Sequence, residues 1–275
     1  MFSPTRTASV ALAAALLLAA CGSDDGDADT ATEETTAVET TVADTTPETT
    51  VADTTPETTE ATTEDTTAST DAPAQDVEAD TAAAEAALLT LADFPEGWSE
   101  SPVDTAATSE IDARLAECVG VDSLTSAAAA ASTPDFVSPD GSLVVSERVG
   151  VQATEQEARL VIAGLTNPDV LECTAAAYAE LGAAALSASA IAEGAEIGEV
   201  TATRLAVGAA GDSTQAIRVV IPVVSGEGTT QVTVDQVMVR AGRSLANLSY
   251  QNGLEATPVE TIDQITAVAA SQLPA

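Results

Sequence analysis

The sequence contains no histidine and no lysine, and only eight arginines oppose 44 acidic residues. Without histidine the chain lacks the commonest general base, the Ser-His-Asp triad and most zinc sites. Without lysine it lacks P-loop and Schiff-base chemistry. The net charge of −36 excludes nucleic acid and anionic membranes as general partners, because both require a cationic face. These absences predict that the protein is not an enzyme, and they leave a hydrolase that uses carboxylates alone as the enzymatic alternative.

Aromatic residues make up 2% of a chain that is 45% hydrophobic, so alanine, valine and leucine must form most of the core. One tryptophan and two tyrosines offer few platforms for stacking sugar rings. Asp25, Asp27 and Asp29 alternate as calcium ligands do, but Thr30 and Thr36 replace the glycine and glutamate that an EF-hand loop requires. We therefore expect no metal and no cofactor.

The N-terminus has the pattern of an export signal. After Arg6, residues 10–20 form an apolar run, which is too short for a membrane-spanning helix. The run ends in Leu18-Ala19-Ala20-Cys21, which resembles the lipobox of bacterial lipoproteins. That resemblance implies a signal peptide over 1–20, and acyl chains such as palmitate on Cys21 that anchor the chain on the extracytoplasmic face of the cell membrane. An ordinary signal peptide with an unrelated cysteine is the alternative.

Residues 21–84 have the composition of a disordered stalk. The segment TTVADTTPE occurs at 40–48 and again at 49–57, and residues 22–84 contain acidic but no basic side chains. A repeat without large apolar residues cannot bury a core, and repulsion between its carboxylates favours an extended chain. The threonine–proline clusters also suit O-glycosylation, which we treat as a hypothesis.

Residues 85–275 are expected to fold as one α+β domain. Alternating apolar residues predict a strand over 143–152. A change of period and glycine-containing turns in the second half predict four more strands over 197–207, 215–224, 231–240 and 244–250. The short glycine-containing links between the last four strands favour an antiparallel meander. Helices are predicted over 83–91 and 110–118, after the Thr154 capping box, from Asp169 and from Pro258. We expect them to pack on one face of the sheet. The net charge of this domain, −19, has no specific explanation in the sequence.

With Cys21 lipidated, Cys118 and Cys173 form an even pair in an oxidising compartment, which predicts a disulfide. Such a bond would stabilise the domain by roughly 4 kcal/mol in the chain-entropy description. Two free buried thiols are the alternative. A zinc site would lack ligands, and no Cys-x-x-Cys motif indicates redox activity.

A few side chains are candidates for ligand contacts, each with a structural alternative. Phe94 and Trp98 either line a cleft or anchor the start of the domain in the core. Tyr178 and Tyr250 are expected to be half-buried with hydrogen-bonded hydroxyls. Four arginines on or beside the strands either converge on an anion or pair separately with acidic residues: Arg204, Arg218, Arg240 and Arg243.

The segment from Leu91 to Trp98, with Phe94-Pro95 and Gly97, follows a threonine-rich stalk and resembles the start of many actinobacterial surface lipoproteins. The order of cysteine-bearing helices, strand meander and final helix is similar to the sensor-domain lipoproteins related to the extracellular domain of mycobacterial serine/threonine kinases. That resemblance implies an antiparallel sheet with helices and a cleft for an extracellular ligand, and it implies no catalytic residues. The kinase sensor contains more than one disulfide, whereas Cys118 and Cys173 allow one here.

Together these observations predict a membrane-anchored extracytoplasmic lipoprotein whose domain binds a ligand or acts as a sensor without catalysis. The partner would be an unidentified small molecule or envelope protein, and no ligand-binding residue can be assigned from the sequence. The alternative function is an envelope interaction or structural module that binds no small molecule.

Overall fold

The protein was analysed as a computed structural model that describes residues 75–102, 105–125, 128–188, 194–226, 228–253 and 255–274. The expected signal peptide, Cys21 and the repeats at 40–57 lie outside the described residues. Within these ranges, none of the helices combines the length and the apolarity needed to span a bilayer.

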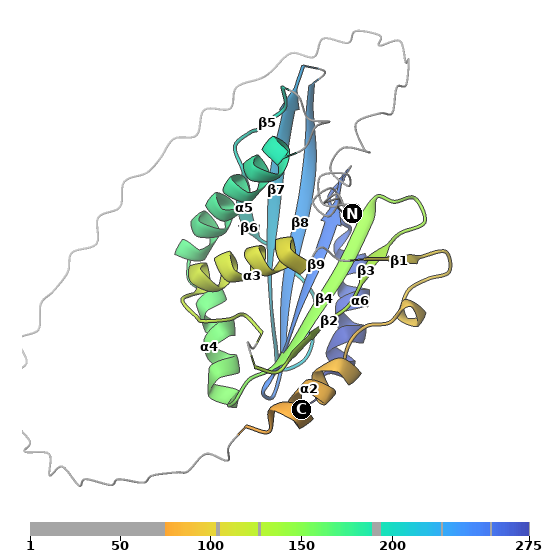
Figure 1. Ribbon diagram of the computed structural model, residues 1–275, viewed down its shortest axis with the longest axis vertical. Coiled ribbons are helices and arrows are strands. Elements are labelled where there is room, and N and C mark those ends of the chain that lie inside the picture. Colours follow the sequence, from red (N-terminus) through yellow and green to blue (C-terminus); the bar gives the residue numbers. More distant parts are fainter. Residues whose placement is uncertain are drawn as a thin grey trace, which may run out of the picture. The chain divides into compact units, whose positions relative to one another are not determined.

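A large antiparallel sheet forms the centre of the domain (Figure 1). Its main strands are β4 (Leu143–Val151), β7 (Ser213–Ser225), β8 (Gly228–Ala241) and β9 (Ser244–Asn252). The strand order is β1-β3-β4-β9-β8-β7-β5, with β2 on β4 and β6 on β7. The shorter strands are β1 (Ser99–Ser101), β2 (Ala130–Ser132), β3 (Asp135–Val137), β5 (Glu196–Ile197) and β6 (Thr201–Arg204).

The expected four-strand meander is confirmed as β6–β7–β8–β9, in which every neighbouring pair is antiparallel. β8 and β9 are joined by a two-residue hairpin, because Ala241 pairs directly with Ser244. Gly242, the first loop residue, has φ +54°, a backbone conformation that glycine adopts without steric cost. The earlier strand β4 pairs with β9 along its whole length, which places it inside the sheet.

The helices also follow the sequence patterns, with shifted ends. They are α2 (Val77–Ala86), α3 (Thr105–Val119), α4 (Glu155–Leu165), α5 (Asp169–Ala188) and α6 (Val259–Gln272). The capping box predicted at Thr154 is present, since Thr154 and Glu157 each accept the other's backbone N–H. The first helix, expected over 83–91, instead begins at Val77 behind the Asp76 cap. The folded domain therefore extends at least to Gln75, ahead of the boundary expected at residue 85.

The expectation that the helices pack on one face of the sheet is wrong. α3, α4 and α5 pack against β7, β8 and β9 in one core, while α2 and α6 cover the opposite face in a second core (Figure 1). The cause lies in the strands: Val237 and Val239 of β8 point into the second core, and Met238 between them points into the first. A strand with apolar side chains at successive positions must be covered on both faces.

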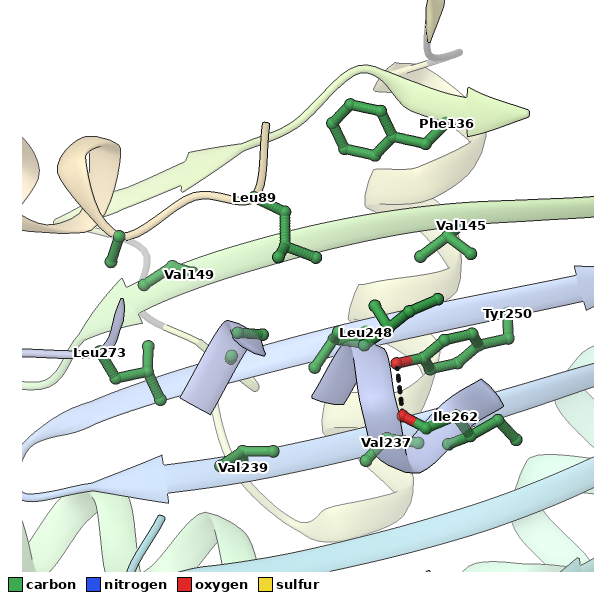
Figure 2. Close-up of a cluster of buried hydrophobic side chains, with 14 of the residues drawn as sticks. Leu89, Phe136, Val145, Val149, Val237, Val239, Leu248, Tyr250, Ile262 and Leu273 are labelled. Atoms are coloured by element: carbon green, nitrogen blue, oxygen red, sulfur yellow. Dashed lines mark hydrogen bonds between the residues drawn. The ribbon is translucent and has the colours of Figure 1, made fainter. Parts of the chain in front are cut away.

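The α2/α6 face is densely filled. Val145, Val149, Leu248 and Tyr250 of the sheet are fully buried against Ile262 and its neighbours in α6 (Figure 2). The Tyr250 hydroxyl lies 2.9 Å from Thr266 Oγ1 and 3.4 Å from the Ile262 carbonyl oxygen, so its polar end is satisfied inside the core.

Candidate functional site

A small cavity lies between the α3–α5 layer and the sheet. It measures about 20 Å³, which is room for roughly one water-sized group. Its walls are mostly apolar, and they come from three helices, three strands and the loop after α3: Leu115, Val119, Leu124, Leu165, Val170, Thr174, Gln215, Ile217, Gln236, Met238 and Asn247.

Two polar atoms at this cavity have no hydrogen-bond partner among the described residues. They are the hydroxyl oxygen of Thr174, a residue that is 1% exposed, and Oε1 of Gln236. The amide nitrogen of Gln236 donates to Tyr178 Oη at 2.9 Å and to Ser249 Oγ at 3.1 Å, so the amide is held in place while its other end is free. Burying a polar group without a partner is unfavourable, and a water molecule or another bound group at the cavity could supply the missing hydrogen bonds.

A charged pair stands beside the cavity, behind Asn247. Asp112 accepts a hydrogen bond from the Arg148 guanidinium at 3.2 Å and from the Asn247 side-chain amide at 3.3 Å. Burial raises the pKa of Asp112 in spite of the opposing charge of Arg148. Burial likewise raises the pKa of Tyr178, which keeps its hydroxyl neutral. The groups that face the cavity itself are therefore neutral amides and a hydroxyl.

The disulfide predicted from the sequence is present and joins two walls of the cavity. Cys118 of α3 and Cys173 of α5 are bonded, with their Cα atoms 5.5 Å apart. Each cysteine directly precedes a lining residue, Val119 and Thr174 respectively. The bond therefore fixes the spacing of the two helices at the cavity, and it also removes the alternative of two free thiols.

The four arginines considered for an anion site are not brought together. Arg218 forms a bidentate pair with Asp235, at 2.6 and 2.8 Å, and donates to the Thr257 carbonyl oxygen ahead of α6. Arg240 pairs with Glu155 and Asp212, and Arg243 pairs with Asp80. Arg204 donates to the carbonyl oxygen of Asn167. The alternative of separate local pairing is the one observed.

The aromatic candidates are core residues. Phe94 is buried between Trp98 and Phe136, with ring centroids 4.7 and 4.5 Å away, on the α2/α6 face. Phe94 and Trp98 thus anchor the start of the domain in the core. The expectation that the two tyrosines are half-buried is wrong, because both are buried, Tyr250 on that face and Tyr178 of α5 on the cavity side. Their hydroxyls are hydrogen-bonded as expected, that of Tyr178 to the Gln236 side chain.

Sequence reasoning did not single out Thr174, Gln236, Asp112 or Asn247. Thr174 follows a cysteine in an alanine-rich helix, and Gln236 interrupts the valine-rich β8 at a position whose neighbours are buried. A polar residue within a two-face buried strand is a detectable signal once both faces are known to be covered. Over the described residues, no group of three or more acidic or cysteine side chains is arranged to hold a metal ion.

No family model matches the chain, and no curated protein matches it. Among solved structures, the extracellular domain of PknH from Mycobacterium tuberculosis is similar over 70% of this chain and 95% of that chain, with 12% sequence identity and a TM-score of 0.34. A likeness this weak transfers neither fold nor function to this chain.

The free hydroxyl of Thr174 generates a stability prediction. Thr174→Val removes a buried polar group without a partner and is expected to raise the free energy of unfolding by about 1 kcal/mol. Thr266→Val is the matched control, because Thr266 is equally buried in a helix but its hydroxyl bonds to Tyr250. That variant should lose about 1 kcal/mol. Urea denaturation measures both, and equal losses in the two variants would contradict the assignment.

Proposed function

We propose that this protein is a lipid-anchored extracytoplasmic lipoprotein whose domain binds a ligand without catalysis, in the cavity between α3, α5 and the sheet. The observation that carries this proposal is the pair of partnerless polar atoms, on Thr174 and Gln236, in a mostly apolar cavity. A ligand that fills the cavity and bonds to these atoms would stabilise the folded state.

The anchor rests on the Leu18-to-Cys21 motif and on the compartment that the disulfide indicates. Disulfides such as Cys118–Cys173 persist in oxidising surroundings, which supports export. A stalk of acidic residues between Cys21 and the domain would keep the domain away from an anionic membrane.

The chemistry of the cavity supports binding rather than catalysis. Its lining residues are apolar side chains, amides and one hydroxyl, so no carboxyl group among the described lining residues is placed for proton transfer. The carboxyl group of the charged pair beside the cavity, Asp112, accepts hydrogen bonds from Arg148 and Asn247. Glu147, whose burial raises its pKa to about 7, belongs to the opposite face of the sheet.

The ligand that fits this lining is neutral and mostly apolar, with a small hydrogen-bonding end group. A carboxylate would lose its hydration in the apolar cavity and would meet a domain of net charge −19. The volume as it stands admits the end group of such a molecule.

The alternative of an interaction module without a small ligand would be supported by a contiguous apolar patch. The large apolar side chains that are exposed among the described residues lie singly on α2, the 3-10 turn at 91–93, α4 and β7: Val77, Leu91, Leu160 and Val224. Isolated apolar residues of this kind are ordinary on protein surfaces.

The anchor can be tested by fractionation. Cys21→Ser removes the thiol that would carry the lipid, so the full chain is expected to move from the membrane fraction to the soluble fraction of the cells that export it. Ser23→Ala, a neighbouring substitution that leaves the thiol, is the control and should stay with the membrane. A Cys21→Ser chain that remains in the membrane fraction would contradict lipid anchoring.

Ligand class can be tested with two probes of equal length, 1-hexanol and hexanoate. Hexanol is expected to shift the methyl NMR signals of Leu115, Val170 and Met238 in a saturable way, and hexanoate should bind at least about tenfold more weakly because its charge must be desolvated. Thr174→Val should weaken hexanol binding, whereas Thr266→Val should not. Equal binding of the two probes, or shifts confined to the α2/α6 face, would contradict the proposal.

A further inference from the structure

The first folded segment of the domain, residues 75–94, lies across the sheet as a strap. It contains α2 and the 3-10 turn Leu91–Asp93, and it joins the domain to the 74 residues that precede it. Ala84, Ala87 and Leu89 bury its apolar side in the α2/α6 core. Figure 2 shows Leu89 over β4, between Val145 and Val149.

Four polar contacts hold this strap to the rest of the domain, and one of them is the hydrogen bond that the Gln272 side-chain amide of α6 donates to Asp93 at 3.3 Å. Gln75 donates to the Val151 carbonyl oxygen at 3.0 Å, near the start of the strap. Asp80 is paired with Arg243 at 2.8 Å. At the other end, the backbone N–H of Leu89 donates to Glu147 Oε2 at 2.8 Å.

The contact between the Leu89 N–H and Glu147 is unusual because the Glu147 carboxyl group is buried. Glu147 is 2% exposed, in the middle of β4 and directly opposite Leu248 of β9. Its other oxygen, Oε1, has no partner within the described part of the chain. A charge at this position would be separated from water and stabilised by a single backbone N–H.

The ionisable groups around Glu147 give an ionised carboxylate no compensation. Asp93 on the 3-10 turn is acidic, and its charge further raises the pKa of Glu147. Tyr250 on β9 is neutral. Its pKa is raised by burial and also by the charges of Glu147, of Asp235 on β8 and of Asp263 on α6. Two arginines of the domain are paired with other acidic residues, Arg218 with Asp235 and Arg243 with Asp80.

We propose that Glu147 is a proton-controlled clasp for the strap: while its carboxyl group is protonated the strap stays docked over it, and when the group loses its proton the cost of the buried charge outweighs the Leu89 N–H hydrogen bond and the strap is released from the sheet. Release uncovers the apolar side chains of β4 beneath Leu89 and lengthens the connection to the preceding chain. It leaves the cavity of the opposite face outside the event, so it is independent of the proposed ligand site.

The sign of the pH dependence follows from the direction of each pKa shift. Burial raises the pKa of Glu147 from 4.5 to about 7, so its contribution to docking is complete below 4.5 and is lost as the pH rises through about 7. The hydrogen bond from Arg243 lowers the pKa of Asp80, so that contact is present above 3.8 and is lost as the pH falls. Both contacts are intact in mildly acidic conditions, and the clasp opens toward the alkaline side.

Hydrogen exchange at the Leu89 amide tests the clasp in the full chain carrying Cys21→Ser. After correction for the intrinsic exchange rate, its protection factor is expected to fall about tenfold between pH 6 and pH 8. Glu147→Gln keeps an acceptor of nearly the same shape without a titrating group, so its protection should be independent of pH. Glu85→Gln, which removes an exposed carboxyl group from the same strap, is the control and should retain the wild-type slope.

A flat wild-type profile, or a Glu147→Gln variant that keeps the wild-type slope, would overturn the proposal. A second readout needs no substitution at Glu147. The carboxyl ¹³C signal of Glu147 in the Cys21→Ser chain should titrate near pH 7. A midpoint near 4.5, the ordinary value for glutamate, would overturn the proposal by itself.

Discussion

The four-strand ladder β4–β9–β8–β7 must be covered on both faces, and the other elements are arranged around that requirement. β8 carries apolar side chains at successive positions, and Leu245, Ala246 and Leu248 do the same in β9. With few aromatic rings in the chain, each face is filled by valine, leucine and alanine, which requires closely packed helices on both sides. α2 and α6 cover one face of the sheet, and α3, α4 and α5 cover the other.

The two faces of the sheet bury different polar groups. On the α2/α6 face, Tyr250 bonds to Thr266 and Arg218 forms a bidentate pair with Asp235, while three buried atoms have no hydrogen-bond partner among the described residues: Glu147 Oε1, Thr257 Oγ1 and Gln272 Oε1. On the α3–α5 face the disulfide fixes two helices, and the Thr174 hydroxyl beside it is left without a partner among the described residues. One face therefore carries the segment that connects to the preceding chain, and the other carries the cavity.

Much of the fold could be predicted from the sequence, because the strong local signals are also the structural ones. The Thr154 capping box, the meander and the Cys118–Cys173 bond are all present. Two-face coverage was missed because the order of helices and strands along the chain does not show that Met238 and Val239 point to opposite faces. The site was missed for a different reason: Thr174 and Gln236 become informative through what surrounds them in space, and spacing along the chain does not report a missing partner.

The α3–α5 face contains a small apolar cavity, whereas the α2/α6 face is densely filled. Methyl NMR of the domain under xenon pressure tests this most directly, because xenon enters apolar cavities without requiring hydrogen bonds. We expect progressive shifts at Leu115, Val170 and Ile217, and none at Val145, Leu248 and Ile262. Shifts at the second group alone, or at neither, would contradict it.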